Sequence, residues 1–156
     1  AYPAAGAHGK RVTAVFRMKQ SQGMLELANR GRGLYAFTPD VVRWVAASGI
    51  ADGLLTLFIQ HTSASLLIQE NYDPDVQADL ERFFARLVKD GDPLFAHSLE
   101  GPDDMPAHVR AALTQTQLSI PVHQGAMSLG TWQGIYLYEH RHLPQRRRVA
   151  IHLIGE

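Results

Sequence analysis

The sequence contains no cysteine, and that absence removes several kinds of chemistry at once. Disulfides, thiolate nucleophiles, iron–sulfur clusters and cysteine-based zinc sites are all excluded, so His, Asp, Glu or backbone oxygen must hold any metal. The chain also lacks an apolar run near the roughly 18 residues of a membrane span, and residues 1–9 lack the charged and apolar blocks of a signal peptide. We therefore expect a cytoplasmic protein without a membrane partner, and a flexible N-terminal segment over residues 1–9.

A net charge is absent as well, since 15 Lys and Arg residues balance 15 Asp and Glu residues. Without a long-range field of one sign, the composition gives no reason to expect nucleic acid as a partner. Hydrophobic residues make up 46% of the 156, as in an ordinary globular protein. A chain of this length can bury about 68–70% of the surface that its unfolded form exposes, so we assign residues 10–156 to a single domain.

Apolar patterning predicts a mixture of strands and helices, which indicates an α+β protein. Strand-like runs are residues 10–18, 24–27, 53–60, 63–69, 118–122, 127–129, 132–140 and 147–154, with a turn at 20–23 between the first two. Helical signals open at Thr38-Pro39-Asp40 and cover residues 75–88 and 106–115. The nearly continuous apolar runs 53–60 and 63–69 predict buried strands, and the apolar stripe of 75–88 predicts a helix that faces the core.

Two polar residues fall at the ends of apolar strand rows. Alternation places His61 on the same face as Ile59, and Glu139 on the same face as Leu137. An imidazole or carboxylate in such a row needs a polar partner if it is buried. The alternative is that each strand ends early and leaves the residue at the rim.

His97 and His108 flank a helix start that has distinctive chemistry. His97 lies in a loop, and His108 falls in the first turn of a helix that follows Asp103 and Asp104. The positive helix end disfavours an imidazolium at His108, which keeps the ring able to bind a metal, and free backbone N–H groups there can bind an anion. The alternative is that Asp103 and Asp104 only cap the helix and that His108 is a surface residue.

Three neutral imidazoles, those of His61, His97 and His108, would suit Zn²⁺ with an open fourth position, where a bound water reaches a pKa of about 7. A rival metal site is His140-x-His142, because residues two apart on a strand share a face. The basic run Arg146-Arg147-Arg148 can hold a phosphate, or it can be a solvated strand edge.

Four sequence blocks stand in order and together resemble one known family. They are His61-Thr62-Ser63-Ala64, Glu70-Asn71-Tyr72-Asp73-Pro74-Asp75-Val76, Gly101-Pro102-Asp103-Asp104-Met105-Pro106-Ala107-His108 and Gly130-Thr131-Trp132-Gln133-Gly134-Ile135. The chain resembles the YjbQ-like family, also labelled secondary thiamine-phosphate synthase, from about residue 10 to residue 156.

The resemblance implies an α+β fold of packed, mainly antiparallel β-sheets around a central helix, assembled as a homotrimer with sites near subunit boundaries. It implies that His61, His97 and His108 occupy the family's histidine positions, surrounded by four polar residues, which are Asn71, Asp73, Asp104 and Glu139.

Three functions follow as hypotheses. The family label implies the coupling of a pyrimidine pyrophosphate to a thiazole phosphate, a reaction that normally calls for Mg²⁺ and carboxylates, whereas histidines suit Zn²⁺ better. A metal-dependent hydrolase or lyase that acts on a small phosphorylated molecule is the second, with Glu139, Asp104 and Asn71 as catalytic residues and Glu139 or Asp104 as the base. A non-catalytic trimeric protein that binds a metal or a small anion is the third.

Overall fold

The computed structural model describes residues 17–156, and the chain forms two antiparallel β-sheets and three α-helices over that range. The predicted segment 1–9, and all but the last two residues of the strand predicted at 10–18, lie outside the described residues. The elements in chain order are β1 (Lys19–Ala28), β2 (Gly33–Ala36), α1 (Thr38–Ser48), β3 (Gly53–Ile59), β4 (Ala64–Glu70), α2 (Pro74–Leu87), α3 (Asp104–Leu113), β5 (Gln117–His123), β6 (Ala126–Met127), β7 (Gln133–Glu139) and β8 (Arg146–Gly155). The α+β class is confirmed.

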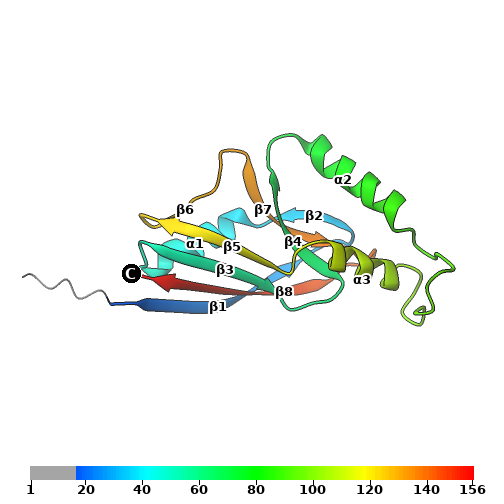
Figure 1. Cartoon of the computed structure of the whole chain (residues 1–156), viewed down its shortest axis with the longest axis horizontal. Coiled ribbons are helices and arrows are strands. Elements are labelled where there is room, and N and C mark those ends of the chain that lie inside the picture. Colours follow the sequence, from blue (N-terminus) through cyan, green and yellow to red (C-terminus); the bar gives the residue numbers. More distant parts are fainter. Residues whose placement is uncertain (1–16) are drawn as a thin grey trace, which may run out of the picture.

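The larger sheet has five strands in the order β1-β8-β3-β5-β6, and the smaller has three in the order β2-β7-β4. Figure 1 shows the long strands side by side along the long axis of the molecule, with α2 and α3 at the end away from the C-terminus. None of the helices in residues 17–156 is long and apolar enough to cross a membrane.

One face of each sheet and the apolar face of α1 enclose the hydrophobic core. The fully or almost fully buried side chains include Val41 and Val45 from α1, Leu55, Leu57 and Ile59 from β3, Leu66 from β4, Leu118, Ile120 and Val122 from β5, Ile135 and Leu137 from β7, and Val149, Ile151 and Leu153 from β8. Burying each such side chain contributes roughly 1.5–3 kcal/mol to folding.

The structure corrects the prediction that the apolar strand 53–60 is buried. β3 alternates, and Leu54 and Phe58 on its second face remain 44% and 46% exposed. The larger sheet therefore covers the core with one face only. A run of apolar residues in a strand does not by itself reveal whether a second layer covers it.

The turn predicted at residues 20–23 is also absent, because β1 runs unbroken from Lys19 to Ala28 beside β8. Gly23 instead allows the Trp44 side chain to lie close to the backbone of β1, because a Cβ added there would be 2.9 Å from the indole nitrogen. The glycine makes room for a side chain of α1 rather than for a reversal of the chain.

The long predicted helix is present as α2, capped by the Asp73 side chain, which accepts a hydrogen bond from the Asp75 N–H. None of its residues is fully buried, so the expectation that it faces the core is wrong. It instead packs on Tyr136 and Tyr138, which β7 presents on the side opposite the core, and the Phe84 and Tyr138 rings stand 5.7 Å apart.

Candidate metal centre

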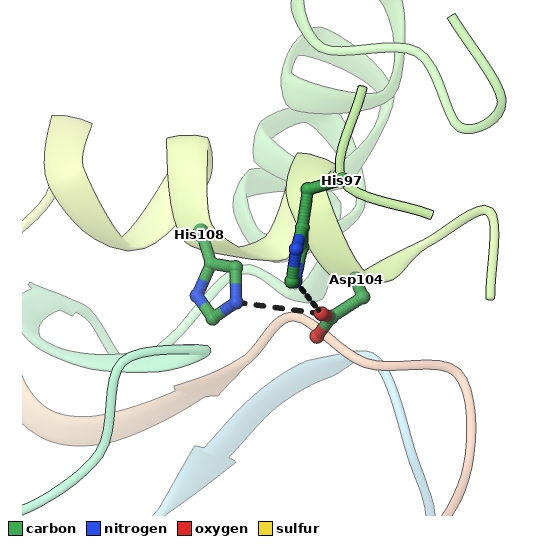
Figure 2. Close-up of side chains that lie close together, drawn as sticks. All are labelled: His97, Asp104 and His108. Carbon is green, nitrogen blue, oxygen red and sulfur yellow. Dashed lines mark hydrogen bonds and ion pairs between the residues drawn. The ribbon is translucent and has the colours of Figure 1, made fainter. Parts of the chain in front are cut away.

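Three side chains around the start of α3 bring potential metal ligands together. His97, Asp104 and His108 each offer one ligand atom, and these atoms all lie within 4.8 Å of one another. Asp104 is the first residue of α3, His108 follows one turn later, and His97 comes from the connection before the helix. Figure 2 shows both imidazoles turned toward the Asp104 carboxylate.

The Oδ2 atom of Asp104 is the centre of this arrangement. It lies 2.7 Å from Nε2 of His97 and 3.4 Å from Nε2 of His108. The Asp104 side chain is only 2% exposed, whereas those of His97 and His108 are 47% and 31% exposed. The carboxylate is therefore buried beneath two imidazoles that solvent can reach.

The backbone of the β3–β4 connection fixes the protonation of His108. Its Nδ1 lies 2.9 Å from the carbonyl oxygen of Thr62. A carbonyl oxygen only accepts, so Nδ1 carries a hydrogen and donates it. In the neutral ring Nε2 then bears a lone pair, and this lone pair faces the Asp104 carboxylate. Two acceptors then face each other, an arrangement that a cation bound between them would make favourable.

His61 does not belong to the cluster that His97, Asp104 and His108 form. Its Nε2 accepts a hydrogen bond of 2.9 Å from the backbone N–H of Arg148, and its Nδ1 lies 3.4 Å from Nη1 of Arg147. Burial, and after it the charge of Arg147, lowers the pKa of His61. Both ring nitrogens thus face β8, and Asp104 takes the third place that the sequence had assigned to His61.

Two hollows border the cluster. His108 and His61 line one of about 270 Å³ together with Thr62, Ala111, Ala112 and Thr116. His97 lines the other, about 360 Å³, in which the loop residues Asp92, Phe95 and Ser98 take part. A small molecule in the first hollow would therefore meet His108, and one in the second would meet His97.

Glu139 is buried and fully occupied as a hydrogen-bond acceptor. Arg147 donates to both of its oxygens, at 2.6 and 2.7 Å, and Asn29 donates at 2.7 Å. The backbone N–H groups of His140 and Arg141 add two more bonds. A general base needs a lone pair that can reach the substrate. Glu139, with 0% exposure, offers none in this arrangement, and its partners give it a structural role.

Asn71 and Asp73 lie in the β4–α2 connection and take no part in the cluster. The Asn71 N–H donates to the Trp132 carbonyl, and Asp73 caps α2. The bond between Asn71 and Trp132 joins the second and the fourth of the sequence blocks that carry the family resemblance.

The rival site His140-x-His142 is not formed. The His140 ring is fully buried and shares a 2.8 Å hydrogen bond with Ser65, whereas His142 is exposed and contacts Asp90 at 2.7 Å. The two rings therefore point to different partners, because residues 140–145 no longer belong to a strand.

Sequence reasoning placed Asp104 near the site but did not count it among the potential metal ligands. The available signal was its spacing from His108, because residues four apart on a helix share a face. Arg141 was missed entirely. It donates from Nη1 to Oδ1 of Asp104 at 2.6 Å, and only the fold brings the β7–β8 connection to α3.

Comparison with known proteins gives a consistent result. Residues 24–156 match the profile of the family described as UPF0047 protein YjbQ-like. The UPF0047 protein sll1880 of Synechocystis is 48% identical over 145 residues, 93% of this chain and 99% of that protein. The UPF0047 protein YjbQ of Escherichia coli O157:H7 is 44% identical over 136 residues, 86% of this chain and 98% of that protein.

Solved structures show the same fold. A hypothetical protein from Aeropyrum pernix K1 superposes with a TM-score of 0.79 at 30% identity, covering 87% of this chain and 99% of that one. An uncharacterized protein of the yjbq/upf0047 family from Clostridium acetobutylicum gives a TM-score of 0.75 at 33% identity, covering 82% and 96%.

Proposed function

This chain belongs to the YjbQ-like UPF0047 family, and we propose that His97, Asp104 and His108 hold a divalent metal, Zn²⁺ in the first place, at the active centre of an enzyme that acts on a small phosphorylated molecule. The hydrogen bond from His108 Nδ1 to the Thr62 carbonyl carries the proposal. Histidines that bind metals commonly donate their second ring N–H to such an oxygen, which fixes the tautomer and the orientation of the ring.

The donor set fits the proposed metal. Two imidazoles and one carboxylate are the ligands of a catalytic zinc site, in which the fourth position stays open. The same set also suits Fe²⁺ in its facial-triad geometry, so elemental analysis must identify the metal. A cation held here would supply Lewis acidity and lower the pKa of a coordinated water to about 7.

The residues in and around the cluster have different roles in the proposed reaction. Asp104 is a ligand and cannot also be the base, because Arg141 occupies its Oδ1. We place the phosphate of the substrate in the hollow beside His61, where the charges of Arg147 and Arg148 lower the pKa of that histidine after burial has done so. Arg147 is paired with Glu139, so Arg148 supplies the positive potential that favours an anion at this end.

A hydrolase or lyase fits this cluster better than the thiamine-phosphate coupling does. The coupling reaction calls for Mg²⁺ held by carboxylates, and the cluster offers a single carboxylate. The non-catalytic alternative, a trimeric protein that stores or senses a metal or an anion, would need no room for a substrate beside the metal. The exposure of both imidazoles, 47% and 31%, favours an enzyme.

Metal content and turnover test the proposal together. We expect purified protein to hold about one Zn²⁺ per chain, and the chelator-treated protein to regain both metal and turnover of small phosphate esters when Zn²⁺ is added. Asp104→Asn should lose the metal. His123→Ala is the matched control, because His123 also pairs with a carboxylate, that of Asp52, at the opposite end of β5.

Each outcome has a definite meaning. If Asp104→Asn binds metal as well as wild type does, the centre is not where we place it. If the protein binds one metal but turns over neither phosphate esters nor the thiamine precursors, the binding-protein alternative replaces the enzyme.

A further inference from the structure

Arg141 reaches from the β7–β8 connection to the segment that carries Asp104. All three nitrogens of its guanidinium group donate there: Nη1 to Asp104 Oδ1 at 2.6 Å, Nε to Asp103 Oδ2 at 3.1 Å, and Nη2 to the Glu100 carbonyl at 2.8 Å. The side chain is 15% exposed. Three of its five N–H donors thus bind the segment from Glu100 to Asp104.

The other end of Arg141 is equally fixed. Its backbone N–H donates to Oε1 of Glu139 at 3.0 Å, and Arg147 holds that carboxylate from the other side. The next residue, His142, donates its N–H to Asp103 Oδ2 at 2.9 Å. A planar guanidinium group held at so many points keeps one orientation. Arg141 therefore sets the orientation of the Asp104 carboxylate.

This arrangement decides which oxygens of Asp104 a metal can use. A carboxylate can bind a cation through one oxygen or through both. Here Oδ1 receives a short, charge-assisted hydrogen bond, and only Oδ2 faces His97 and His108. A metal that took both oxygens would have to displace Arg141 from Oδ1.

We propose that Arg141 is a positioning residue of the metal centre, which makes Asp104 a ligand through one oxygen and thereby keeps a coordination position open for water or substrate. The inference rests on the proposed function, since it presupposes a metal at His97, Asp104 and His108. A purely structural Arg141 would only tie the segment before α3 to the β7–β8 connection.

Cobalt substitution separates the two roles, because Co²⁺ absorbs visible light much more strongly when it is four-coordinate than when its coordination number is higher. We expect Co²⁺ in wild-type protein to give the strong four-coordinate spectrum. Arg141→Met frees Oδ1, so the absorption should weaken and the dissociation constant should rise by about 10–100-fold, the usual effect of losing a group that orients a ligand.

Two variants separate the contact with Asp104 from the anchoring of the segment. Arg141→Lys keeps a donor for Oδ1 but loses the fork that also reaches Asp103 and Glu100, so it should retain the wild-type spectrum. Asp103→Asn weakens the anchoring without touching Asp104, so it should lower the melting temperature and leave the spectrum unchanged. Arg141→Gln takes the place of Arg141→Met if the latter does not fold.

The inference is overturned if Arg141→Met, or Arg141→Gln in its place, keeps the wild-type Co²⁺ spectrum and affinity while it melts at a lower temperature. It is overturned as well if Arg141→Lys behaves like Arg141→Met, because the spectrum would then follow the anchoring. A wild-type protein that binds no Co²⁺, or that binds it equally well after His108→Ala, overturns the proposed function itself and with it the inference.

Discussion

Glu139 and Arg147 form a two-point ion pair in the interior, with Nη2 2.6 Å from Oε1 and Nε 2.7 Å from Oε2. The Glu139 side chain is 0% exposed and that of Arg147 is 6% exposed. Arg147 also reaches the hydroxyl of Ser63 at 2.9 Å, next to His61. The pair thus links β7 and β8 to the β3–β4 connection, and it holds the backbone from which Arg141 extends.

Breaking this pair should be costly. We expect Glu139→Gln to lower the free energy of unfolding by about 3–5 kcal/mol, because it leaves the Arg147 charge buried without a counter-charge. Urea unfolding measures the change. Asp40→Asn, which breaks the exposed pair with Arg43, is the control and should change the stability by about 0.5 kcal/mol or less. A double variant, Glu139→Met with Arg147→Met, should lose less than the single one. Equal stability of Glu139→Gln and wild type would contradict the structural role.

Gly31 lies where the chain passes close to the β7–β8 connection. Its φ is +111°, and a Cβ there would lie 2.1 Å from the His142 carbonyl oxygen. Gly33 has a φ of +140° but no atom within 4 Å of the corresponding position. Ala at Gly33 should therefore cost only the backbone strain of about 1–3 kcal/mol. Ala at Gly31 must displace a carbonyl in addition, and it should be the less stable of the two by a further ~1–3 kcal/mol. Thermal unfolding of both variants tests the difference, and equal melting temperatures would show that the close approach carries no cost.

The sequence predicted the local features of this fold better than the long-range ones. Periodicity correctly indicated α2, and alternation correctly placed Glu139 in an apolar row that required a partner. The exposure of Phe58 could not be inferred, because no local signal shows that one face of the larger sheet is uncovered.

The arrangement around His61 depends on contacts across the chain. Its Nε2 meets the Arg148 N–H because β3 pairs with β8, in a register that aligns Ile59 with Val149. Sequence patterns give the strands but not this pairing, so they could not show that the ring faces β8. The helical spacing of Asp104 and His108, by contrast, could have been used directly.

His140 should make stability depend on pH. Burial, and after it the charges of Arg110 and Arg32, lowers its pKa from 6.5 to about 3. Between these two pH values the unfolded chain binds a proton that the folded chain does not. The neutral His140 therefore costs no stability above pH 6.5. As the pH falls from 6.5 toward 3, the free energy of unfolding decreases by about 1.4 kcal/mol per pH unit.

Urea unfolding of the chelator-treated protein at several pH values between 7.5 and 4 measures this slope. His140→Gln keeps a hydrogen-bonding side chain for Ser65 but cannot titrate, so its stability should fall less steeply with acid than that of wild type. His152→Gln, on the partly exposed face of β8, is the control and should follow wild type. Identical slopes for His140→Gln and wild type would rule out the buried neutral histidine as the cause.

We also propose the homotrimer that the family resemblance implies, and its mass can be measured. Each chain weighs 17.3 kDa, so light scattering should give about three times that value. The motivation is the family resemblance and the second face of the larger sheet, where the apolar side chains Leu54, Phe58 and Ile154 are 39–46% exposed on neighbouring strands. A mass of one chain at micromolar concentration would remove the trimer from the proposal.

Two variants distinguish the ligand set that the sequence suggested from the cluster that His97, Asp104 and His108 form. His108→Ala should abolish Zn²⁺ binding and leave the fold intact, because the residue lies one turn inside α3 and Ala favours helices. His61→Ala should retain Zn²⁺, since the ring nitrogens of His61 face Arg147 and Arg148. Metal content and thermal unfolding are measured on the same preparations, with chelator-treated wild type as the control for stability that the metal itself adds. Loss of Zn²⁺ from both variants would mean that the His61 ring turns toward His108 when the metal binds, and the three-histidine centre would then replace the cluster around Asp104.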